Sequence, residues 1–103
     1  MIGTEAKPAI PALIGATKDK EDFVRNNALW ALSRIHQEPD LVIPVLIESL
    51  NDSFRAAREN AAIGLMAYGT NATIAIPALE DVATDNRAAK FALEQIESAA
   101  KTK

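Results

Sequence analysis

A tetrapeptide that returns at a constant interval is the feature of this 103-residue sequence that most constrains its fold. Its three copies are Ile10-Pro11-Ala12-Leu13, Ile43-Pro44-Val45-Leu46 and Ile76-Pro77-Ala78-Leu79, and each step raises the numbering by 33. A period between about 20 and 50 residues is typical of chains built from stacked units, each of which buries its apolar face against its neighbours. We therefore expect three similar units that share one continuous core.

The apolar spacing inside each copy predicts two α-helices. One helical face is marked by the i, i+3, i+4, i+7 pattern at Ile43, Leu46, Ile47 and Leu50. Polar segments such as Asn51-Asp52-Ser53 and Thr84-Asp85-Asn86 supply turn residues and N-caps, and Gly69 suits a left-handed C-cap. We expect first helices near 5–18, 40–51 and 72–84, and second helices near 22–36, 54–68 and 86–100.

The prolines of the three tetrapeptides, Pro11, Pro44 and Pro77, lie about one turn inside the expected first helices. Proline lacks an amide hydrogen, so inside a helix it removes a hydrogen bond and bends the axis. We expect a bend at the same place in every repeat.

The ends of the repeats depart from the strict period. In the third copy, Ala92-Leu93 aligns with Ala31-Leu32 at an offset of 61, where two full periods would give 66, which predicts that five residues are missing from its inter-helix turn. At the other end, Gly3-Thr4 matches Gly69-Thr70, so the chain opens on residues that normally end a repeat. We expect a single repeat domain over 1–103, either a piece of a longer array or its descendant, with repeats near 4–36, 37–69 and 70–103.

Two runs carry a resemblance to a known family, namely Ala9-Ile10-Pro11-Ala12-Leu13-Ile14 and Val24-Arg25-Asn26-Asn27-Ala28-Leu29-Trp30-Ala31-Leu32. They resemble the short bacterial HEAT repeat, also called the phycobilisome-lyase type. The resemblance implies an all-α fold, an armadillo-like α-solenoid of three antiparallel helix pairs that acts as a non-enzymatic scaffold for proteins. Because related proteins occasionally bind chromophores or nucleic acids, two alternatives stay open: a subunit or remnant of a bilin lyase, and a nucleic-acid-binding solenoid.

The charge balance disfavours the second alternative. Eleven Lys and Arg residues face 14 Asp and Glu, a formal net charge of −3, so no broad positive field attracts phosphate or anionic lipid. The sequence also lacks the run of about 18 apolar residues that spans a bilayer. We expect a cytoplasmic protein whose partner is a protein or peptide, with neither nucleic acid nor a membrane as partner.

The residue types needed for catalysis or metal binding do not cluster in this sequence. There is no cysteine, His36 is the one histidine, and the four glycines are scattered. Asp19, Asp52 and Asp85 recur at one repeat position, about 10 Å apart, which is too far for shared acid–base work or for one metal ion. We expect each aspartate to accept hydrogen bonds from turn amides, and the family resemblance adds a ladder to Arg25 and Arg58. No catalytic, metal or cofactor site is predicted.

The remaining signal is a stripe of large apolar residues. Trp30, Ile63 and Phe91 fall at one equivalent position of the three second helices, which in the related repeats faces the concave groove. One hypothesis is an exposed partner-binding surface, and the alternative is that the three side chains are buried between repeats. Under the first hypothesis the binding residues also include the polar or adaptable neighbours Asn26, Arg34, Glu59, Met66 and Gln95.

The two ends of the stack differ in polarity. Glu80 replaces Ile14 and Ile47, and a polar tail follows, so we expect a C-terminal cap. The first repeat keeps Ile10, Leu13 and Ile14. If these residues are not buried within their own repeat, its N-terminal face is expected to form a homodimer or to contact further repeats.

Overall fold

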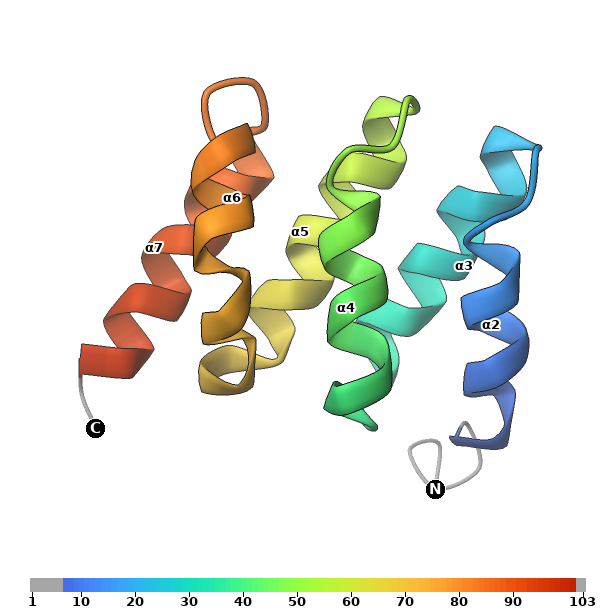
Figure 1. Cartoon of the computed structure of the whole chain (residues 1–103), viewed down its shortest axis with the longest axis horizontal. Coiled ribbons are helices and arrows are strands. Elements are labelled where there is room, and N and C mark those ends of the chain that lie inside the picture. Colours follow the sequence, from blue (N-terminus) through green and yellow to red (C-terminus); the bar gives the residue numbers. More distant parts are fainter. Residues whose placement is uncertain (1–6, 102–103) are drawn as a thin grey trace.

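Six α-helices in three antiparallel pairs make up residues 7–101, the part of the chain that the computed structural model describes (Figure 1). The match at Gly3-Thr4, the start of the first expected helix, and the last two residues of the chain lie outside these residues. Within them there is no β-strand. The expected all-α stack is confirmed.

The helices form two layers (Figure 1). The first helices make up one layer: α2 (Ile10–Ala16), α4 (Pro39–Ser49) and α6 (Ile76–Val82). The second helices lie behind them: α3 (Asp22–Ile35), α5 (Arg55–Ala67) and α7 (Arg87–Lys101). Helix α3 packs against α5, and α5 packs against α7, so the second-helix layer is continuous from the first repeat to the third.

The three repeated prolines do not play one role. Pro11 and Pro77 lie in the first turns of α2 and α6, and each of these helices is preceded by a 3-10 helix, η1 (Lys7–Ala9) and η2 (Gly69–Ala75). Pro44 instead lies inside the continuous helix α4. Proline is tolerated in a first helical turn because the amide there has no partner within the helix. In the first and third repeats, proline therefore marks a change from 3-10 to α geometry rather than a bend within one α-helix.

The deletion in the third repeat removes helix rather than turn. Four residues separate α6 from α7, against five between α4 and α5. Buried Ala89 and Ala92 of α7 correspond, at an offset of 28, to buried Ala61 and Gly64 of α5. In this register α7 begins about one turn later than α5. The expected position of the deletion, in the turn, was therefore wrong: α7 lacks the first turn of a second helix.

Small residues on the second helices let the layers approach closely. Ala57, Ala61 and Ala62 of α5 are fully buried against leucines of the core such as Leu46. A methyl group added to Gly64 would lie 3.0 Å from Leu46 Cδ1 and 3.3 Å from Ser33 Cβ. This contact places α5 tightly against both the preceding second helix and α4.

The N-terminal face is less open than the sequence suggested. Ile10 is only 1% exposed, and Leu13 and Ile14 are half-buried against the same core. The expectation that Ile10 contributes to a homodimer or further-repeat surface was wrong, because the first repeat buries this side chain itself. Phe23 and Val24, at the start of α3, are exposed large apolar residues of the first repeat, and the Phe23 ring packs edge-on against Phe54 of the second repeat.

Hydrogen bonds at the turns confirm one rung of the expected Asp–Arg ladder. Asp19 and Asp52 each accept the amide hydrogen two residues ahead, and Arg25 reaches across the repeat boundary to Asp52. Arg58 donates to the carbonyls of Asp52 and Ser53 in its own turn, and no ion pair joins it to Asp85 within the described residues. The cap of α7 is Asn86, whose Oδ1 accepts the Ala89 amide at 3.0 Å.

Candidate partner-binding site

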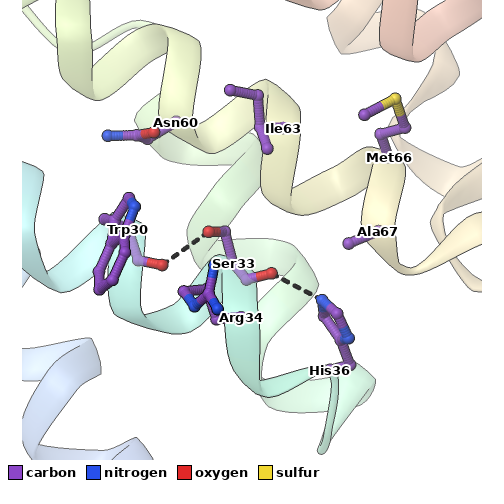
Figure 2. Close-up of a pocket in the computed structure, with 8 residues that line it drawn as sticks. All are labelled: Trp30, Ser33, Arg34, His36, Asn60, Ile63, Met66 and Ala67. Atoms are coloured by element: carbon purple, nitrogen blue, oxygen red, sulfur yellow. Dashed lines mark hydrogen bonds between the residues drawn. The ribbon is translucent and has the colours of Figure 1, made fainter.

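A groove of about 370 Å³ lies between α3 and α5 on the second-helix layer (Figure 2). On the α3 side, the groove is lined by Trp30, Ser33 and Arg34, and by His36, the residue that ends the helix. Its α5 side consists of Asn60, Ile63, Met66 and Ala67. The groove thus joins the first repeat to the second, and it contains two members of the predicted stripe, Trp30 and Ile63.

The stripe residues are exposed, so the alternative that they form part of the core was wrong. Trp30 is 54% exposed, Ile63 43% and Phe91 52%. The reason is helical periodicity: neighbours such as Leu29 and Leu32 take the core-facing positions of α3, which turns Trp30 away from the interior. That these residues bind a partner stays a prediction.

Arg34 holds one face of the indole ring. Its guanidinium carbon lies 5.1 Å from the centroid of Trp30, one helical turn away in α3, which is a cation–π contact. Within residues 7–101, no hydrogen bond or ion pair engages the Arg34 side chain, so its N–H donors stay available to a ligand.

The floor of the groove is ordered by local hydrogen bonds at the end of α3 (Figure 2). Ser33 Oγ donates to the Trp30 carbonyl at 2.6 Å, and His36 Nε2 lies 2.8 Å from the Ser33 carbonyl. His36 ends the helix with φ at 58°, in the left-handed region, at the repeat position that Gly69 occupies with φ at 60°. The first repeat therefore has an imidazole side chain at a position where the second repeat has glycine. This ring lies at the edge of the groove.

The comparison with known families agrees with this geometry. The family model described as HEAT repeat matches residues 9–38, a segment that contains α2, its turn and α3. This first helix pair is similar to a HEAT repeat. Neither the curated proteins nor the solved structures give a match. The bacterial, phycobilisome-lyase subtype and the bilin-lyase alternative stay untested.

Other residues predicted for the site lie outside this groove. Asn26 Oδ1 accepts a hydrogen bond from Asn60 Nδ2 at 2.7 Å, so it joins two second helices rather than facing a free surface. Glu59 is paired with exposed Arg55 at 3.3 Å. Gln95 is exposed on α7 and lines neither of the second-helix hollows.

Phe91 belongs to a second, wider hollow of about 940 Å³ at the α7 end of the helical stack. Its other side chains are largely charged, among them Arg87, Lys90, Glu94 and Glu97. The structure therefore divides the predicted stripe in two: Trp30 and Ile63 share one groove, whereas Phe91 lies in another.

The stripe hypothesis missed an apolar surface on the first-helix layer. Leu41 and Ile74 are 52% and 73% exposed, and Ile74 lines a hollow of about 390 Å³ with Ile43, Pro44 and Ile47. Leu41 and Ile74 stand one full period apart, so the repeat alignment itself contained the signal. Polar residues are usual at exposed positions, but both repeats have a large apolar residue here.

Within residues 7–101, no three His, Asp or Glu side chains gather as metal ligands, and no helix is long and apolar enough to cross a membrane.

Proposed function

We propose that this HEAT-repeat protein is a non-enzymatic interaction module that binds a segment of another protein in the groove between α3 and α5. HEAT repeats are helical-repeat interaction modules, and stacked helix pairs offer extended surfaces for partners. What the fold alone leaves open is which surface takes the partner.

The observation that carries the proposal is Trp30, a tryptophan more than half exposed and already stacked with Arg34. Tryptophan and arginine are enriched among the residues that contribute most to binding energy at protein interfaces. Ile63 and Met66 add apolar area on the opposite side of the groove, while Ser33 and Asn60 add polar atoms. An apolar centre with a polar edge is the usual composition of a protein-binding surface.

The open shape of the groove suits a short peptide segment. A volume of about 370 Å³, open to solvent between two helices, accommodates a few side chains of an extended or helical peptide. Phe91, further along the same layer, would contact a longer segment that runs across α5 toward α7.

Peptide selection tests this proposal. A displayed library of random peptides is selected on the wild-type chain, and the affinity of each enriched peptide is measured by fluorescence anisotropy. Replacing Trp30 with Ala is expected to weaken binding by about tenfold or more, the usual effect of removing an interface hot spot.

The matched control is Ile74→Ala, which removes an exposed apolar side chain from the first-helix layer. Affinity should stay within about twofold of wild type in this control. Peptides that bind the Trp30→Ala and Ile63→Ala variants as tightly as the wild type would place the binding surface elsewhere and refute the proposal.

A further inference from the structure

The charge of the groove is opposite to that of the chain. Among the eight lining residues, Arg34 is cationic and none carries a carboxylate. The whole chain has a formal net charge of −3. A local positive site on an acidic protein favours a ligand of negative charge at that point.

Two acidic groups of the second repeat are already paired. On α5, Glu59 forms an ion pair with Arg55. In the turn before α5, Asp52 forms an ion pair with Arg25 of the first repeat. Neither carboxylate therefore neutralises Arg34. The indole of Trp30 covers one face of the Arg34 guanidinium, while the N–H donors lie at the edge of that plane.

The same repeat position has a different charge in the other repeats. Arg34 corresponds to Ala67 in the second repeat and Gln95 in the third, and Ser33 corresponds to Met66 and then to Glu94. At these two positions, a cation is therefore present only in the first repeat, and the one carboxylate, that of Glu94, is in the third. A carboxylate of a bound segment is therefore attracted to Arg34 and has no cation at the equivalent positions of the other two repeats.

We propose that the groove binds a peptide segment in which an acidic residue lies beside apolar ones, with its carboxylate on Arg34. Its apolar side chains pack between Trp30, Ile63 and Met66, and the acidic residue lies at the α3 end of the layer. Arginine suits this role because its planar fork of N–H donors matches both oxygens of a carboxylate. This inference rests on the proposed function and specifies the chemistry of the partner.

The peptides selected above supply the probes. We expect Asp or Glu to be enriched beside aromatic or aliphatic residues, and Arg34→Glu to weaken their binding by about tenfold or more. Arg34→Gln, which keeps a similar size and removes the charge, should weaken binding less than Arg34→Glu. The control Lys20→Glu changes the net charge equally at an exposed position of the turn between α2 and α3, and should leave the affinity within about twofold of wild type.

A charge exchange makes the test specific. When the acidic residue of a selected peptide is replaced with Lys, the new peptide should bind Arg34→Glu about tenfold more tightly than it binds the wild type. A structural effect of the Arg34 substitution would not produce this rescue. Added NaCl should weaken the original peptide's binding to the wild type more than its binding to Arg34→Gln.

Several outcomes would overturn the inference, and they separate it from the proposed function. If enriched peptides lack acidic residues, or bind Arg34→Glu within about twofold of wild type while Trp30→Ala abolishes binding, the groove binds peptides but this chemistry is wrong. If no enriched peptide depends on Trp30, both proposals fail. Displacement of a selected peptide by a single-stranded oligonucleotide would assign the positive site to phosphate instead.

Discussion

Arg25 of the first repeat and Asp52 of the second are joined by two hydrogen bonds, Nε to Oδ2 at 2.8 Å and Nη2 to Oδ1 at 3.0 Å. The exposed fractions of the two side chains are only 13% and 9%. Asp52 Oδ1 also accepts the Phe54 amide at 2.8 Å, so one carboxylate orders its own turn and ties it to the preceding repeat. The contact is a specific link between units that otherwise meet largely through apolar packing.

Removing this carboxylate should destabilise the protein. Asp52→Ala is expected to lower the free energy of unfolding by about 2 kcal/mol, because Arg25 loses one of its two carboxylate partners and the Phe54 amide loses its acceptor in a largely buried place. The matched control is Asp85→Ala, at the same repeat position, where the aspartate is exposed and is not paired with Arg58 in the described part of the chain. Urea denaturation measures both variants. Equal losses in the two would contradict the role of the Arg25–Asp52 pair.

The same pair predicts a pH dependence. Burial is the largest single influence and by itself raises the pKa of Asp52. Hydrogen bonds from Arg25 and the Phe54 amide, with the charges of Arg25 and Arg58, outweigh it and lower the pKa below its ordinary value of 3.8. An acid whose pKa is lowered by folding stabilises the fold above its unfolded pKa, and this stabilisation is lost as the pH falls through the folded pKa.

The stability difference between the wild type and Asp52→Asn should therefore be constant near pH 6 and shrink as the pH falls below about 4. Urea titrations at a series of pH values measure it. A difference that does not change with pH would mean that the charge of Asp52 contributes nothing to the fold.

Tyr68 predicts a second pH effect, at the alkaline end. Burial, with a smaller contribution from the charge of Glu38, raises its pKa to about 12, and its hydroxyl donates to the Gln37 carbonyl at 2.7 Å. Because the pKa of this acid is raised by folding, the stabilisation is present below the ordinary value of 10.0 and is lost as the pH rises through about 12.

Tyr68 is the one tyrosine of the chain, so phenolate absorbance reports on it alone. We expect a midpoint near 12 while the helical circular dichroism is intact, and a Tyr68→Phe variant whose stability falls less between about pH 10 and 12. An ordinary midpoint in the folded chain would show that the hydroxyl is solvated.

His36 predicts a backbone effect. Both His36→Gly and His36→Ala remove the imidazole, but only glycine adopts a φ of 58° without a steric cost. The Gly variant should be more stable than the Ala variant by about 1 kcal/mol. Gly69→Ala, at the equivalent position with φ at 60° and open space around it, should lose a similar amount. Alanine and glycine variants of equal stability at position 36 would refute the assignment of a strained helix end.

The repeat period predicted most of this fold because it is a property of the whole sequence rather than of local propensity. Three copies of one pattern constrain one another, so the helix pairs and their approximate bounds could be read from the apolar spacing. The period could not place the deletion, because a loss in a turn and a loss in the first turn of α7 give the same alignment. Only the structure shows that the first turn of α7, where the other second helices have Arg25 and Arg58, is the part that is missing.

The candidate site was predicted only in part. Alignment placed Trp30 and Ile63 at one position, but their exposure depends on the rotation of each helix about its axis, which the period does not specify. The link between Asn26 and Asn60 depends on the spacing of α3 and α5, and small residues such as Gly64 determine that spacing. The prediction for Ile10 was wrong because it assumed that apolar residues at the N-terminal face of the stack are exposed. The first repeat alone can bury this side chain.

The free energy of unfolding of the Trp30→Ala variant, measured by urea denaturation, tests most directly whether the groove is a receiving surface. Because the ring is more than half exposed, its removal should cost about 1 kcal/mol or less, including the lost contact with Arg34. A loss of about 3 to 5 kcal/mol, as expected on truncation of a buried tryptophan, would show that Trp30 belongs to the core and would contradict a binding surface there.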